Sequence, residues 1–149
     1  MKGFTLLEIL IVISIMVILL TVVVVSFSSL TKNQALENAV EEIISQLNSA
    51  RSKTLGSENL YQYGVHFESG EITLFRGTVY SQTDPNNAKI TLSPQVEISD
   101  ISLNGGVNAV FQKQTGKTDN FGTIIIRLKA DVSKTKTIEI EKTGIINVL

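Results

Sequence analysis

The first thirty residues are dominated by one apolar run. Residues 9–25 are all apolar except Ser14 and Thr21. The hydrocarbon core of a bilayer is about 30 Å thick and takes roughly 20 helical residues to cross. With its flanking apolar residues, the stretch 4–30 exceeds this length. It therefore predicts a membrane-spanning helix, since a helix that is apolar on every side would need a much larger domain to bury it.

Beyond residue 31 the apolar residues recur at steps of three and four. This spacing is typical of an amphipathic helix that buries one face. No Gly or Pro lies between Phe4 and Leu55, so one helix is expected to run between them and to break at Gly56. We expect its stripe to lie on a sheet; a coiled-coil seam is the alternative, although the stripe lasts barely two heptads. The apolar positions are Leu36, Ala39, Val40, Ile43, Ile44, Leu47 and Ala50.

After Gly56 the period changes to two, which is typical of strands. A hairpin is expected first, because two alternating segments flank the dipeptide Ser69-Gly70. Turn residues rich in Gly, Asn and Asp separate the later segments. The pattern predicts an α+β fold, with a long N-terminal α-helix packed on an antiparallel β-sheet head. The expected strands are 63–67, 72–74, 89–92, 96–103, 109–112, 123–128, 137–141 and 145–148.

Composition excludes several classes of protein. The chain has 149 residues, 14 acidic and 13 basic side chains, no cysteine and one histidine. A net charge of −1 gives no basic footprint for nucleic acid. The cysteine count excludes a disulfide scaffold and, with a single histidine, a zinc site.

No catalytic constellation is visible, so the chain is not expected to be an enzyme or to need a cofactor or metal. His66 lies in a predicted strand, where a partly exposed sheet histidine is expected. Asp84, Asp119 and Asp131 lack the spacing of a calcium loop and are expected to be turn residues.

The apolar run carries one informative charge. Between Lys2 and Lys32 only Glu8 is charged. A charged, unpaired carboxylate within hydrocarbon costs on the order of a few kcal/mol. Glu8 therefore either stays at the headgroup level or finds a cation.

The residues around Glu8 carry a family resemblance. The segment Lys2-Gly3-Phe4-Thr5-Leu6-Leu7-Glu8, abutting a full-length apolar run, resembles the start of the type IV pilin and type II secretion pseudopilin superfamily. The resemblance implies cleavage between Gly3 and Phe4 by a membrane prepilin peptidase, followed by N-methylation at Phe4. It makes Glu8 the fifth residue of the mature chain, which is the hallmark acid of the family.

Cleavage would give each subunit one new cation beside this anion. Pairing the ammonium of Phe4 with Glu8 of a neighbouring subunit removes two unpaired charges from hydrocarbon. The pair would fix the axial register of the helices. The expected organisation is a leader at 1–3, a transmembrane and filament-core half of the helix at 4–30, an amphipathic half at 31–55 and a β-rich head at 56–149.

The head resembles the minor pseudopilin type called GspH or FimT. The resemblance implies a minor subunit that helps to initiate a filament or sits near its tip. Some relatives of this type bind DNA through a basic C-terminal tail, but this chain ends Ile-Asn-Val-Leu, so nucleic acid is not an expected partner. The residues that carry the resemblance are 47–52, the first hairpin, Phe111, Gly116, 123–126, 138–140 and 144–146.

The very short leader predicts a cytoplasmic N-terminus and a head outside the cytoplasm. The positive charge of Lys2 weakly favours the same orientation. The resemblance implies the bacterial cytoplasmic membrane, then a pilus or pseudopilus. It also implies partners: other pilin or pseudopilin subunits, the prepilin peptidase, a membrane assembly platform and membrane lipid. Two alternatives stay open. One is a single-pass anchored binding domain that does not polymerise, and the other is a secreted domain whose signal peptide is cut near Ser29.

Overall fold

A computed structural model describes residues 3–56 and 60–149, with side chains given outside 22–30. One long helix, α1 (Leu6–Leu55), begins two residues after the expected start at Phe4 and ends at Leu55, as the break at Gly56 predicts. The chain divides into two compact units, Met1–Gln34 and Ala35–Leu149, so α1 contributes to both.

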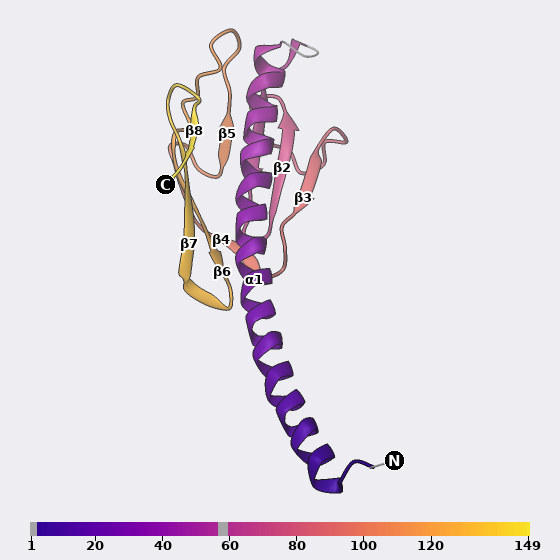
Figure 1. Ribbon diagram of the computed structural model, residues 1–149. Coiled ribbons are helices and arrows are strands. Elements are labelled where there is room, and N and C mark those ends of the chain that lie inside the picture. Colours follow the sequence, from indigo (N-terminus) through magenta and orange to yellow (C-terminus); the bar gives the residue numbers. More distant parts are fainter. Residues whose placement is uncertain (1–2, 57–59) are drawn as a thin grey trace. The chain divides into compact units, whose positions relative to one another are not determined.

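The second half of α1 buries the predicted stripe. Its apolar positions are buried at steps of three and four, whereas the acidic positions between them are exposed. The buried helix residues are Ala35, Leu36, Ala39, Val40, Ile43, Leu47 and Ala50, with Ile44 partly buried against them. The prediction that this face lies on a sheet is confirmed (Figure 1).

Four strands form the first sheet: β1 (Tyr63–Phe67), β2 (Glu71–Arg76), β3 (Ala88–Thr91) and β5 (Asn108–Val110). Their order is β3-β2-β1-β5, and each neighbouring pair is antiparallel. β1 and β2 make the expected hairpin: Phe67 pairs with Ile72, and the Glu68 N–H donates to the Glu71 carbonyl oxygen at 2.9 Å across Ser69-Gly70.

The second sheet contains β4 (Val96–Leu103), β6 (Gly122–Leu128), β7 (Asp131–Ile140) and β8 (Ile146–Val148), in the order β4-β6-β7-β8. The expected strand at 137–141 is longer than predicted, because β7 already begins at Asp131. Residues 131–135 are all exposed and polar apart from Val132, so they carry no alternating pattern. Their pairing to β6, with an irregularity between Arg127 and Leu128, places them in the strand.

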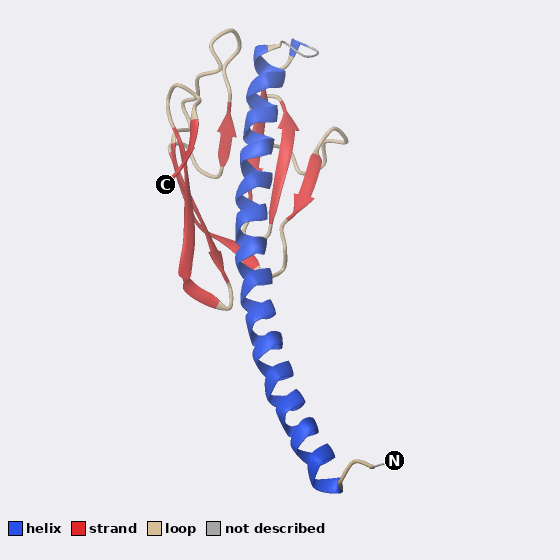
Figure 2. Cartoon of the chain, viewed as in Figure 1, coloured by secondary structure: helices blue, strands red, loops and turns tan. Residues whose placement is uncertain are grey.

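The fold class is confirmed as α+β, with two antiparallel sheets where one was expected (Figure 2). A single cluster of buried side chains joins the stripe of α1 to both sheets. Its largest fully buried members include Phe67, Phe111, Ile124, Ile126 and Ile138. Burying each such side chain contributes about 1.5–3 kcal/mol.

Two polar side chains near the end of α1 attach it to the head. The buried Thr54 hydroxyl donates to the Ala50 carbonyl at 2.8 Å and accepts the Tyr63 N–H at 2.9 Å, which fixes the start of β1. The Arg51 Nε donates to the Gly116 carbonyl oxygen at 3.1 Å. A side chain at Gly144 would place its Cβ 1.9 Å from that same Gly116 oxygen.

Gly144 is therefore expected to be irreplaceable by alanine. Its φ is +79°, which disfavours any L side chain, and the added Cβ would overlap the Gly116 oxygen. Gly144→Ala should lower the free energy of unfolding by about 2–4 kcal/mol. The measurement is urea unfolding of the full chain in a nonionic detergent, followed by circular dichroism.

Gly70→Ala is the matched control, because a Cβ at Gly70 meets no atom within 4 Å. Its unfolding midpoint should stay near that of the unchanged chain. Equal midpoints for the two variants would contradict the close approach at Gly144.

Candidate assembly site

The start of α1 is capped by Thr5. Its hydroxyl oxygen accepts the Glu8 backbone N–H at 3.2 Å, and its carbonyl oxygen accepts the Ile9 N–H at 3.3 Å. Threonine at this position satisfies one of the free N–H groups that every helix start leaves. The sequence analysis missed this role, although Thr-x-x-Glu is the spacing of a capping box.

Glu8 lies in the first turn of α1 and is exposed. A carboxylate there interacts favourably with the partial positive charge of the helix start. Its side-chain oxygens accept no hydrogen bond and form no ion pair within the described residues.

Phe4 and Glu8 line the same open depression, of about 210 Å³. Ile9, Val12 and Ile13 complete its lining, and the wall is wholly apolar, so Glu8 contributes the aliphatic part of its side chain to it. Gly3 lies apart from it in open space, with nothing within 4 Å of where its Cβ would be. Of the three residues expected to act in processing and assembly, Gly3 and Phe4 form an exposed dipeptide, and Phe4 and Glu8 line the depression.

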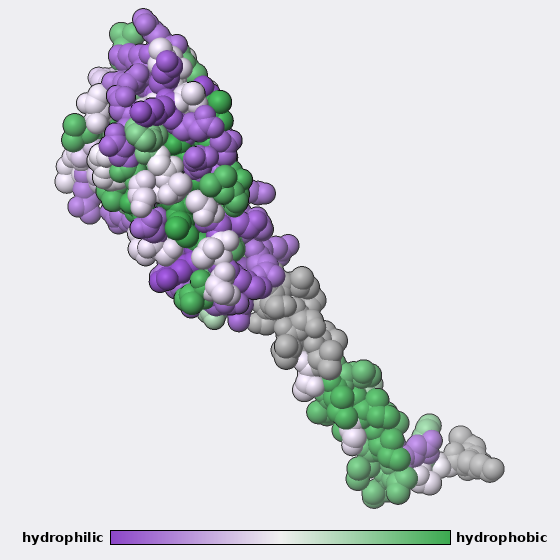
Figure 3. Space-filling view, turned by 90° about the vertical axis from the view of Figure 1, so that its left-hand side faces the viewer, coloured by the Kyte–Doolittle hydropathy of each residue, from purple (hydrophilic) through white to green (hydrophobic). Residues whose placement is uncertain are grey.

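The described side chains of the first unit, residues 1–34, form an exposed apolar surface along α1. Large apolar side chains from Phe4 to Leu20 are between 49% exposed, at Ile11, and 80% exposed, at Leu6. In Figure 3 this part of α1 is green, whereas the visible face of the head mixes purple, white and green. An apolar surface of this extent marks contact with lipid or with other proteins.

The two polar residues within the apolar run are satisfied by their own helix. The Ser14 hydroxyl donates to the Leu10 carbonyl oxygen at 2.8 Å, and the Thr21 hydroxyl donates to the Ile18 carbonyl oxygen at 2.7 Å. Such bonds remove the cost of placing a free hydroxyl in an apolar environment.

Within the part of the chain whose side chains are described, no helix is both long and apolar enough to cross a membrane. The expected span at 4–30 includes residues 22–30, whose side chains lie outside the described ones.

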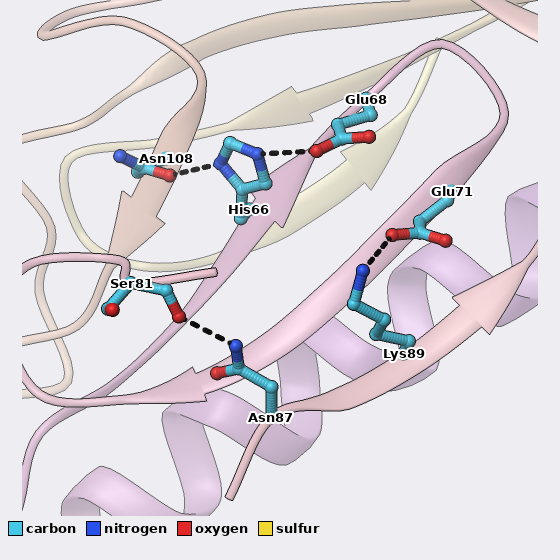
Figure 4. A network of polar contacts seen from close by, with 7 residues as sticks. All are labelled: His66, Glu68, Glu71, Ser81, Asn87, Lys89 and Asn108. Atoms are coloured by element: carbon cyan, nitrogen blue, oxygen red, sulfur yellow. Dashed lines mark hydrogen bonds and ion pairs between the residues drawn. The ribbon is translucent and has the colours of Figure 1, made fainter. Parts of the chain in front are cut away.

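The single histidine has a place in the architecture of the head. The His66 Nδ1 lies 2.7 Å from Asn108 Oδ1, and its Nε2 lies 3.2 Å from Glu68 Oε1 (Figure 4). The Tyr80 ring stacks on the imidazole, with a centroid distance of 3.8 Å and an interplanar angle of 9°. The stacked Tyr80 belongs to the connection between β2 and β3, so this contact holds the connection against β1.

The three aspartates named above make local bonds. The Asp84 Oδ1 accepts the Asn86 N–H at 2.8 Å, which lowers the pKa of the Asp84 carboxyl. A hydrogen bond from Ser133 likewise lowers the pKa of Asp131. The Asp119 Oδ2 accepts Gln112 Nε2 at 2.7 Å. Within the described ranges no three His, Cys, Asp or Glu side chains gather into a group that could hold a metal ion.

Comparison with known proteins identifies the N-terminal segment and the fold. Residues 1–24 match the family described as the prokaryotic N-terminal methylation motif. No curated protein matches the chain.

The chain is similar in fold to solved structures from two bacteria. The chain is similar to the minor pseudopilin EpsH of the type 2 secretion system of Vibrio cholerae, with 13% identity, a TM-score of 0.57, and coverage of 76% of this chain and 95% of that one. It is also similar to the type IV minor pilin FimU of Pseudomonas aeruginosa strain PAO1, with 15% identity, a TM-score of 0.59, and coverage of 76% and 92%. A second EpsH structure matches at 16% identity, a TM-score of 0.57, and coverage of 80% and 95%.

The cap at the start of α1 can be tested directly. Thr5→Ala removes the oxygen that accepts the Glu8 N–H, and losing such a cap costs about 1 kcal/mol. The Glu8 amide should then exchange its hydrogen roughly fivefold faster. NMR hydrogen exchange of the full chain in nonionic detergent micelles measures this, with Thr5→Ser as the control that keeps a hydroxyl. Equal exchange in the two variants would show that Thr5 does not cap the helix.

Proposed function

We propose that this chain, which joins the N-terminal methylation motif to the fold of minor pseudopilins and minor pilins, is a structural subunit of a type IV pilus or type II secretion filament. The observation that carries the proposal is the motif over residues 1–24, continuous with an exposed apolar helix. The subunit acts by packing and not by catalysis, as a minor component of its filament.

Processing between Gly3 and Phe4 is part of the proposal. Support comes from the position of this peptide bond ahead of α1, which begins at Leu6. Both residues are exposed, and the space around Gly3 is open. A peptidase can therefore reach the bond without unwinding the helix.

The ammonium that cleavage leaves on Phe4 then pairs with Glu8 of a neighbouring subunit. Support comes from the exposure of Glu8 in the first turn of α1, beside an apolar depression that it lines together with Phe4. An incoming helix in the correct register neutralises this charge, whereas a misregistered helix leaves two buried charges unpaired at a cost of several kcal/mol. The pair accordingly selects one register more than it adds net stability.

Before assembly, the apolar half of α1 holds the subunit in the cytoplasmic membrane, with the N-terminus in the cytoplasm and the head outside. The exposed apolar side chains and the internally bonded Ser14 and Thr21 support insertion of this half into a membrane. Its partners are other pilin or pseudopilin subunits, a prepilin peptidase and a membrane assembly platform.

Mass spectrometry of the N-terminus tests the processing step. Protein recovered from assembled filaments should begin with an N-methylated Phe4. A chain that keeps Met1, Lys2 and Gly3 inside filaments would overturn the proposal. A mature N-terminus near Ser29, with the head free in the medium, would instead support the secreted domain.

The charge of Glu8 is the second test. Glu8→Gln keeps the size of the side chain but removes its charge, so filament incorporation should fall by roughly tenfold or more because the incoming ammonium stays unpaired. Membrane insertion should not change. Incorporation is measured by quantitative immunoblotting of sheared filaments against the membrane fraction.

Glu8→Asp is the matched variant, since it retains a carboxylate in the first turn. It should incorporate better than Glu8→Gln. Normal incorporation of Glu8→Gln would show that the pair does not set the register, even if Phe4 is found to be methylated.

A further inference from the structure

The first sheet of the head has an open edge at β3. This strand ends the order β3-β2-β1-β5, and no other described strand pairs with its outer side. The Leu92 N–H donates to the Gly70 carbonyl oxygen at 3.0 Å, so position 92 turns its backbone toward β2. Because backbone direction alternates along an antiparallel strand, Lys89 and Thr91 turn theirs toward the open edge.

A groove of about 350 Å³ lies between this edge and α1. Ile90 of β3 forms one wall, and polar side chains of α1 form the other: Asn38, Glu41, Glu42, Ser45 and Gln46. The groove therefore lies between the Ile90 side chain and a polar flank of α1. Lys89 and Thr91, whose backbones face the open edge, are the chain neighbours of Ile90.

The two carboxylates of this groove differ from three other glutamates of the head. Glu37, Glu71 and Glu97 each pair with a Lys or Arg nitrogen, at 2.7–2.8 Å. Glu41 and Glu42 have no ion pair with any described residue, and both are exposed. Two unneutralised acids at adjacent positions favour a cationic occupant.

We propose that this groove binds an extended segment of another protein that carries Lys or Arg at alternating positions, added as a fifth strand beside β3. The backbone of the segment bonds to Lys89 and Thr91. Alternate side chains of an added strand point to one face of the sheet, which here faces the flank of α1. Its basic residues thereby reach Glu41 and Glu42.

Strand addition divides the work between backbone and side chains. Main-chain bonds supply affinity without selecting a sequence, and the side chains supply specificity. β3 has only four residues, so it offers few backbone bonds. The acidic pair must then decide which segment stays bound. This binding site is independent of the proposed filament role, because it uses the second half of α1 and β3, and neither Phe4 nor Glu8.

The test uses the full chain in a nonionic detergent and a fluorescent synthetic peptide of about eight residues that alternates lysine and valine. Fluorescence anisotropy should show saturable binding that weakens with salt. A peptide of the same composition with its lysines in one block should bind more weakly. An alternating glutamate and valine peptide should not bind.

Glu41→Gln combined with Glu42→Gln should weaken binding of the lysine peptide by about 3- to 30-fold. Glu139→Gln on β7 is the matched loss of one acid away from the groove and should leave binding unchanged. Equal binding by the groove variant and the unchanged chain would overturn the proposal.

Thr91→Pro removes the N–H that faces the open edge, which edge strands tolerate, and should abolish binding. Thr91→Ala keeps that N–H and should bind normally, and thermal unfolding by circular dichroism checks that both variants fold. If Thr91→Pro and Thr91→Ala bind the peptide equally, binding depends on surface charge alone, and strand addition is overturned. A different outcome is that the chain associates with itself. If it does, and if the Glu41 and Glu42 substitutions abolish that association, the occupant is a second copy of the chain and the proposal is overturned.

Discussion

One constraint organises this molecule: a single helix has to satisfy two environments. Its backbone is bonded internally along its whole length, so its side chains decide what surrounds each part. In the described part of its first half, apolar side chains point in every direction and are exposed. In its second half only a stripe is apolar, and Ile43, Leu47 and Ala50 are fully buried against the strands. The head exists because that stripe supplies part of its core.

Much of this architecture was predictable from periodicity. The absence of Gly and Pro before Gly56 located the end of α1 at Leu55, and the alternating segments around the Ser69-Gly70 turn located the first hairpin. The hydrophobic periodicity did not predict a strand where both faces of that strand are exposed to solvent. The first half of β7 shows this, because its polar residues lie outside the strand predicted at 137–141, and only pairing with β6 makes them part of a strand.

The arrangement of the strands into two sheets was also beyond local pattern. It depends on pairings between distant segments, such as His66 with Asn108 in the β1–β5 pair. For the same reason the groove at β3 could not be predicted, since it joins Glu41 and Glu42 to Ile90. The proposed processing and assembly residues Gly3, Phe4 and Glu8 lie within six positions of the sequence, so they could be proposed without any tertiary contact. The capping role of Thr5 emerged only from the hydrogen bonds.

The composition of the core has a consequence for the order in which the protein is made. The stripe of α1 shares one buried cluster with Ile138 and Ile140, near the end of the chain. A ribosome therefore releases the helix long before it supplies the strand that completes the cluster. During that interval the stripe stays uncovered, and contacts between such distant segments form slowly. Biogenesis of the head is a late event, and the nascent helix needs shelter in the meantime.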